Sequence, residues 1–213
     1  MKIALIVENS QAAKSSMVED ALRSVAEPAG HTVHHYGMYG ADDAAQMTYV
    51  MNGILAGILL NTRAADFVVT GCGTGVGSML GCNAMPGVFC GLVMDPTDAF
   101  LFGQINDGNA ISMPYAKGFG WAAELNLQDC YRKLFEVKRG VGYPKERAEI
   151  MAKNRGILKE VKAAACHDML TVLRTLDQDL VRAAISGERF SDLFFENCQD
   201  DAVADHLRGV LGA

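Results

Sequence analysis

Residues 66–77 of this chain read Asp66-Phe-Val-Val-Thr-Gly-Cys-Gly-Thr-Gly-Val-Gly77, and this stretch decides the fold. Its apolar, mostly β-branched and aromatic first part predicts a buried strand over residues 66–70. The strand enters a loop with glycine at every second position, and residues 76–83 can then form a short helix. A buried strand that leads into a helix in this way is typical of α/β proteins with parallel strands.

The same alternation of strand and helix extends in both directions along the chain. Residues 2–7 predict a strand, and Glu8-Asn9-Ser10 predicts a turn that caps a helix over 11–26. Further strands are expected at 31–36, 88–94 and 110–113, with helices capped by Asp42 or Asp43 and ending near 62, starting at Pro96, and spanning 119–136. Five strands joined by helical crossovers predict a three-layer α/β/α sandwich with a five-stranded parallel, Rossmann-like sheet.

The predicted secondary structure changes near residue 143. Residues 145–211 contain no convincing strand and are rich in helix formers, so we expect an α/β domain over 1–143 and a helical C-terminal extension over 144–213. The extension has a dense apolar anchor at Phe190, Leu193, Phe194 and Phe195. Stabilisation of a dimer is its expected role, with cover for a subunit interface or an active site as alternatives.

Composition and charge exclude several classes of function. Half of the 213 residues are hydrophobic, so we expect a folded globule, and a net charge of −6 gives no basic surface for nucleic acid. Signal-peptide and membrane-span patterns are missing, and we predict a cytoplasmic protein. The six cysteines form no Cys-x-x-Cys pair, so the pattern predicts free thiols and no zinc site.

The glycine loop has the properties of an anion-binding cradle. Alternating glycines let several backbone amides converge on one point, and the following helix adds positive potential, so we expect the loop at Gly73, Gly75 and Gly77 to bind substrate. Its spacing fails the Gly-x-Gly-x-x-Gly dinucleotide pattern, and no Gly-Lys-Ser/Thr forms a P-loop. Ser78 stands where a thiol phosphatase would need arginine. The alternative to an anion-binding cradle is a glycine-rich turn that binds no ligand.

Cys72 occupies an unusual place beside this cradle. A helix N-terminus favours the thiolate, so Cys72 could act as a base or nucleophile near neutral pH, and the Thr74 hydroxyl could bind a developing oxyanion. Together these residues suit proton abstraction next to a carbonyl. A small, inert cysteine packed under the helix is the alternative interpretation.

The loop also resembles that of the type B ribose-5-phosphate isomerases, a family that includes the galactose-6-phosphate isomerase subunits. The resemblance covers roughly residues 1–150 and is most specific in Cys72-Gly-Thr-Gly-Val-Gly77 followed by Asn83, Pro86-Gly87 and Asn106-Asp107-x-Asn109. It implies that Cys72 moves a proton through an enediolate, assisted by Thr74, and that Gly73, Gly77 and Asn106 bind substrate oxygens. It also implies no metal and a homodimer, or dimer of dimers, with active sites between subunits; no cofactor is expected.

Departures from the family pattern concern the substrate. Glu8-Asn9 stands where Asp-His is common, and Ile105 stands where a ring-opening His often lies. Phe89 replaces a phosphate-binding arginine, and only Arg147 remains of two arginines near residue 143. Ring opening therefore needs another group or an open-chain substrate.

The expected function is an aldose–ketose isomerase of a small sugar phosphate, of the ribose 5-phosphate or galactose 6-phosphate type. Cys72 and Thr74 are the candidate catalytic residues, and the candidate substrate-binding residues are Glu8, Asn9, Gly73, Gly75, Gly77, Asn106 and Arg147. An isomerase of an unphosphorylated sugar, a non-catalytic sugar- or anion-binding protein, and a lyase or epimerase that uses the same intermediate remain alternatives.

Overall fold

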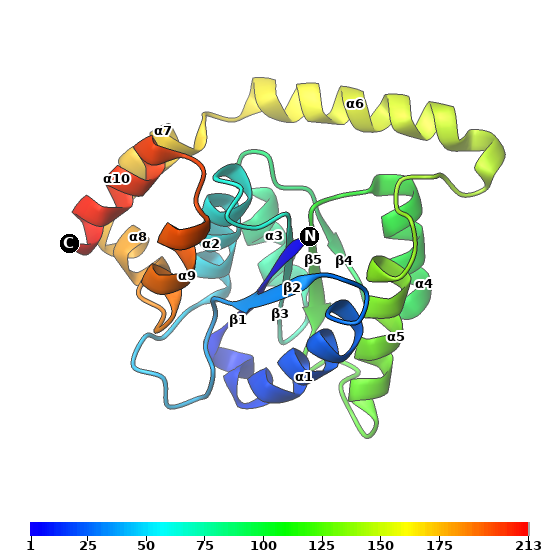
Figure 1. Cartoon of the computed structure of the whole chain (residues 1–213), viewed down its shortest axis with the longest axis horizontal. Helices are drawn as coiled ribbons and strands as arrows, with labels where there is room; N and C mark the ends of the chain where they lie inside the picture. The colour runs from blue at the N-terminus through cyan, green and yellow to red at the C-terminus, as the bar shows by residue number, and fades with distance from the viewer. Residues whose placement is uncertain (213) are drawn as a thin grey trace.

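A computed structural model describes residues 1–212, which form a parallel five-stranded sheet with helices on both faces (Figure 1). The strands lie in the order β2-β1-β3-β5-β4, and every neighbouring pair is parallel. Their bounds are β1 Lys2–Val7, β2 Thr32–His35, β3 Phe67–Cys72, β4 Cys90–Leu92 and β5 Ala110–Pro114. The predicted three-layer α/β/α sandwich is therefore confirmed.

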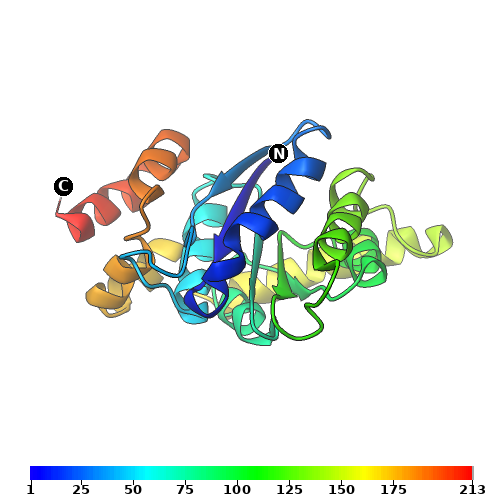
Figure 2. The same cartoon turned by 90° about the horizontal axis from the view of Figure 1, so that it is seen from below.

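The two faces of the sheet bury alternate residues of each strand. Ile3, Leu5 and Val7 of β1 pack in one apolar cluster, whereas Ala4 and Ile6 pack in another, as the two-residue period of a strand requires. The first face is covered by α1 Ser15–Ala26, α4 Pro96–Leu101 and α5 Ala123–Phe135, and the second by α2 Tyr49–Asn61 and α3 Val76–Asn83 (Figure 2).

Most of the C-terminal extension continues the second cluster of the core. Phe190 and Phe194 are buried, stack with ring centroids 4.8 Å apart, and pack in the same cluster as Tyr36 and α2. The predicted apolar anchor thus holds the extension on its own chain. The extension comprises η3 Lys145–Arg147, α6 Ala148–Ala165, α7 Met169–Thr175, α8 Gln178–Ala184, α9 Phe190–Asn197 and α10 Asp201–Leu211.

Helix α6 differs from the other helices of the extension. It crosses one end of the sheet (Figure 1), beside the segments that precede β4 and β5. None of its 18 residues, all within the described part of the chain, is buried.

The expected helix from Asp42 or Asp43 to about residue 62 is wrong in its first part. The Asp43 carboxylate accepts a hydrogen bond from the Tyr39 backbone amide, and Gln46 Nε2 donates to the Ala41 and Asp43 carbonyls. These side chains therefore close a loop instead of capping a helix. Thr48 is the N-cap, and α2 begins at Tyr49.

Two other helices begin later than expected. Residues 9–14 form a 3-10 helix, η1 Asn9–Lys14, before α1 begins at Ser15. The helix expected over 119–136 starts at Ala123, because Ala122 has a left-handed backbone conformation that a helix cannot include. Within residues 1–212, no helix is both long and apolar enough to cross a bilayer.

The strand order places the ligand-binding end of the sheet. From β1 the chain moves outward to β2 on one side and later to β3 on the other, so the connections after β1 and β3 diverge. Ligands of such sheets bind in the crevice at the carboxyl ends of those strands. Glu8 follows β1 and Cys72 ends β3, which places both at this crevice.

Candidate active site

The loop after β3 is held against β5 by its own carbonyl groups. The Cys72 carbonyl accepts from the Tyr115 amide at 2.9 Å, and the Gly73 carbonyl accepts from Ala116 and Lys117. A further bond at 2.6 Å joins the Ser112 hydroxyl to the Gly75 carbonyl. Because N–H and C=O point in opposite directions across a trans peptide, these bonds turn the next amides away from β5. The loop is therefore a rigid set of backbone donors.

Cys72 is buried at the centre of these donors. Burial alone raises the pKa of a thiol, but the backbone amides of Ser78, Thr74 and Gly75 and the Ser78 hydroxyl favour the thiolate, and together they lower the pKa of Cys72 below its usual value. Cys130 shows the opposite case, because burial raises its pKa to about 12. The loop thus converts one of six free thiols into a stronger acid.

Two glycines of the loop meet specific constraints. Gly75 has φ +76°, and a Cβ there would lie 2.6 Å from Cδ1 of Leu92. A Cβ at Gly77 would lie 3.2 Å from the ring of Tyr49, which begins α2 and is half-exposed beside the loop. Tyr49 reaches this place because α2 and α3 cross closely at Gly53 and Gly81. The candidate site therefore has an aromatic wall.

The residues after β1 form a chain of hydrogen bonds next to the loop. Lys14 Nζ donates to Gln11 Oε1 at 2.8 Å, Gln11 Nε2 donates to Ser10 Oγ, and Ser10 Oγ donates to Glu8 Oε1 at 2.5 Å. Glu8 is buried and also accepts from the Ser10 amide, whereas Asn9 is exposed. Gln11 Nε2 lies 3.6 Å from where a Gly73 Cβ would be, so this chain borders the cradle.

Seven predicted site residues therefore gather at the carboxyl end of the sheet, and we call them the carboxyl-edge group. Thr74 is exposed at its surface, where its hydroxyl accepts from the Val76 amide at 3.3 Å. The group consists of Glu8, Asn9, Cys72, Gly73, Thr74, Gly75 and Gly77.

Asn106 and Arg147 lie at the opposite end of the sheet and form the amino-edge group. The register pairs Cys72 with Pro114 at one end of β5 and Val68 with Ala110 at the other, about 13 Å away at 3.3 Å per residue. Asn106 lies four residues before Ala110. Residues 140–142 run beside the segment that carries Asn106, since the Gly140 amide donates to the Gly103 carbonyl and the Gly142 amide to the Gln104 carbonyl, and Arg147 follows five residues later. Within a single chain, the two groups therefore lie at opposite ends of the sheet.

Asn106 borders a cavity of about 430 Å³, which is also lined by Phe89, Cys90, Asp98 and Leu158, among others, but not by Arg147. Asn106 ends η2 Phe102–Asn106, one turn of π-helix, and is exposed; Arg147 is also exposed. Among residues 1–212, His, Cys, Asp and Glu side chains nowhere gather in the groups of three that could hold a metal ion.

Sequence reasoning did not assign roles to Ser78 or Tyr49. A signal for Ser78 was present, because it lies in the first turn of the helix that follows the loop. Tyr49 gives no such signal, since its position depends on the crossing of α2 and α3.

A family model described as ribose/galactose isomerase matches residues 3–129. The chain belongs to the ribose/galactose isomerase family. A second model, described as ribose-5-phosphate isomerase, matches residues 164–210 of the extension. Curated protein sequences gave no significant match.

Solved structures support this membership over the whole chain. A 4-deoxy-L-threo-5-hexosulose-uronate ketol-isomerase, complexed with a tartrate, is 54% identical, with 100% of each chain covered and a TM-score of 0.98. A ribose-5-phosphate isomerase from Vibrio parahaemolyticus is 52% identical, with 99% of each chain covered and a TM-score of 0.97. The type B enzyme of Trypanosoma cruzi shares the fold at 15% identity, covering 77% of this chain and 99% of its own, with a TM-score of 0.62. The chain is accordingly a sugar isomerase, an intramolecular oxidoreductase.

Proposed function

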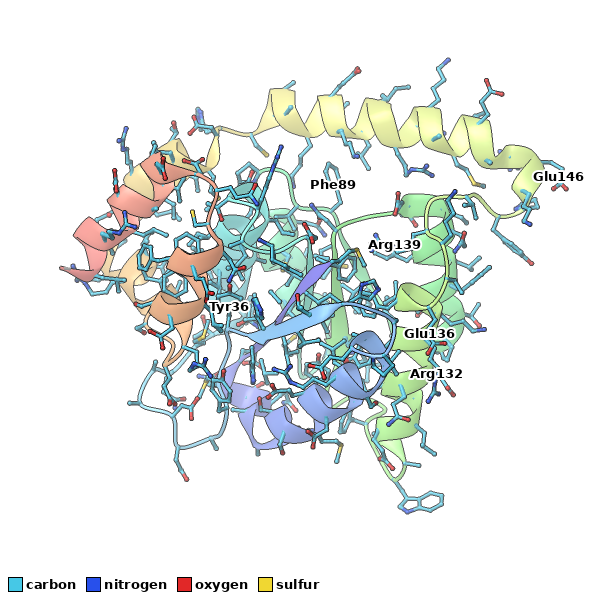
Figure 3. All side chains as sticks on the ribbon, viewed as in Figure 1. Tyr36, Phe89, Arg132, Glu136, Arg139 and Glu146 are labelled. Atoms are coloured by element: carbon cyan, nitrogen blue, oxygen red, sulfur yellow. The ribbon has the colours of Figure 1, made fainter. Side chains whose placement is uncertain are left out.

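We propose that this isomerase acts on an open-chain, unphosphorylated sugar acid of the 4-deoxy-5-hexosulose-uronate class. The observation that carries the proposal is the loss of ionisable groups at Asn9, Phe89 and Ile105, where the family resemblance expects ring-opening and phosphate-binding side chains. Phe89 lies beneath α6 (Figure 3), and neither its ring nor the Ile105 side chain can donate a proton or pair with a phosphate.

The chemistry of such a substrate accounts for the missing imidazoles. An aldose closes its ring by adding O4 or O5 to the C1 aldehyde. In a 4-deoxy-5-ulose, position 4 carries no hydroxyl and position 5 is a ketone, so neither ring can form in this way. The enzyme then needs no residue to open a ring.

The charge of the substrate agrees with the reduced number of arginines. A carboxylate carries a single charge and accepts a bidentate arginine fork, whereas a phosphate dianion commonly requires more cationic donors. We assign Arg147, on the amino-edge group, to the carboxylate. The full-length similarity to a uronate ketol-isomerase supports a substrate that carries a carboxylate.

Cys72 is the proposed base of the reaction. Its thiolate removes the proton from C2, the electrons pass to the C1 carbonyl oxygen, and an enediolate forms. The Cys72 thiol exchanges this proton with solvent and then delivers a proton to C1, while the hydroxyl proton of C2 passes to the oxygen at C1. These transfers convert the aldehyde into CH2OH and the carbinol into a ketone. Thr74 and the amides at Gly73, Gly75 and Gly77 stabilise the oxyanion, and Glu8 and Asn9 border the substrate.

The complete site requires a second copy of the chain. Cys72 and Asn106 lie at opposite ends of one sheet, so both can touch one small molecule only if the amino-edge group of a partner meets the carboxyl-edge group. We therefore propose a symmetric homodimer with two composite sites.

The test is a comparison of substrates by NMR in deuterated water. We expect the 4-deoxy-5-hexosulose uronate to be converted with deuterium incorporated at C1, and ribose 5-phosphate and galactose 6-phosphate to be converted far more slowly. Turnover of a sugar phosphate with no turnover of the uronate would instead support the second candidate, a sugar-phosphate isomerase. The 52% identity to a ribose-5-phosphate isomerase favours that candidate.

A further inference from the structure

Helix α6 is fastened to the α/β domain by cations that bind backbone carbonyls. Arg155 Nη1 donates to the Ile105 carbonyl at 3.0 Å, and its Nη2 donates to the Gly140 carbonyl at 3.1 Å. One turn of helix further on, Leu158 lines the cavity that Asn106 borders. Lys162 binds the Asn83 carbonyl and lies 5.9 Å from the centre of the Phe89 ring. One face of α6 therefore contacts the segments before β4 and β5.

The segment that Arg155 holds has an uncommon backbone conformation. Residues 102–106 form a turn of π-helix, and Asp107 has φ +47° without being glycine. Both features are uncommon and persist only when the surroundings hold them. Asn106 is the last residue of this turn and directly precedes Asp107, so a relaxation of this segment would move its side chain.

Two arginines hold the segment from different sides. Arg139 pairs with Asp107 at 3.2 Å, binds the Gly108 carbonyl, and lies 4.6 Å from the centre of the Phe67 ring. Arg139 belongs to the α/β domain (Figure 3), whereas Arg155 comes from the extension. Arg155 is the one that binds the carbonyl of Ile105, the residue directly before Asn106.

We propose that Arg155 is a positioning residue that orients Asn106 for substrate through the Ile105 and Gly140 carbonyls. The inference rests on the proposed function, in which Asn106 of one chain touches the substrate in a site shared with Cys72 of its partner. A planar guanidinium can hold two carbonyls at a fixed separation, and a lysine ammonium lacks this rigid fork. The extension thereby contributes to catalysis without touching the substrate.

The test compares kcat and KM of Arg155→Met, Arg155→Lys, Asn106→Ala and the Arg155→Met/Asn106→Ala double variant. We expect Arg155→Met to lower kcat about tenfold or more with little change in KM, because the segment that carries Asn106 loses two charge-assisted hydrogen bonds. Arg155→Lys should recover part of the loss. The double variant should be no slower than Asn106→Ala, since Arg155 acts through Asn106.

Lys153→Met is the matched control, because it removes an exposed cation two residues away on the same helix. It should leave kcat and KM unchanged. The inference would be overturned if Arg155→Met were as active as an active wild type. It would also be overturned if the loss of kcat in the double variant were the product of the losses in the two single variants.

A second measurement separates this inference from the proposed function. Hydrogen exchange of the amides at residues 105–108 should be faster in Arg155→Met than in the wild type and in Lys153→Met, whatever the substrate. If none of the tested sugars is turned over, the proposed function fails, and unchanged exchange in Arg155→Met would still refute the positioning role.

Discussion

The two ends of the sheet hold parts of the site that are built in different ways. The carboxyl-edge group centres on Cys72 and the backbone amides around it, and hydrogen bonds from β5 and the segment after it hold the loop that follows β3. The amino-edge group consists of exposed side chains, and one of them, Asn106, lies on a segment that two arginines hold, one of these arginines from a helix 50 residues further along the chain. The first is fixed locally, and the second depends on the extension. Substitutions at the amino-edge group can therefore change substrate recognition without disturbing the residues that transfer the proton.

The largest expected effect is at the thiol. Cys72→Ala should lower turnover about a thousandfold and abolish exchange of the substrate's C2 hydrogen with solvent, because the proposed base is lost. Cys166→Ala, which removes a partly exposed thiol in the extension, is the control and should have wild-type activity. Undiminished deuterium incorporation in Cys72→Ala would show that another group is the base.

The rigidity of the carboxyl-edge loop can be tested through stability. At Gly118, where φ is +70° and a Cβ would meet nothing within 4 Å, alanine should cost roughly 1–2 kcal/mol from the left-handed backbone alone. Gly75→Ala adds the contact with Leu92 and should cost roughly 1–3 kcal/mol more. Urea unfolding of both variants measures the difference; equal losses would mean that the loop moves freely.

A smaller effect is expected from the Ser78 hydroxyl. The Ser78 hydroxyl favours the thiolate and so lowers the pKa of Cys72, which means that Ser78→Ala should shift the pH profile of iodoacetamide alkylation at Cys72 to higher pH. The Ser78 amide remains, so the shift is partial. Ser24→Ala on α1 is the control. An unshifted profile would leave the lowered pKa to the backbone donors alone.

The sequence predicted the local features of the fold more reliably than the distant ones. A buried strand, alternate glycines and a short helix are read within twelve residues, and the structure places them accordingly. The start of α2 was misjudged because Gln46 and Asp43 bind backbone groups in a loop, and their side-chain bonds compete with a helix cap.

The division of the site was also implicit in the sequence. Cys72 ends a strand, whereas Asn106 precedes one, and parallel strands place such residues at opposite edges of a sheet. The neighbours that come from other elements gave no such signal. Tyr49 depends on a close helix crossing, and Arg155 depends on the path of α6 across the end of the sheet (Figure 1).

The composite site is tested most directly by mixing two defective chains. Cys72→Ala and Asn106→Ala should each be severely impaired as homodimers. In hybrid dimers made by co-expression with two tags, one site carries both changes and the other carries neither. An equal mixture should then recover about a quarter of wild-type turnover, since half of the dimers are hybrid and each has one intact site. Turnover no greater than that of the two separate variants would contradict a site shared between subunits.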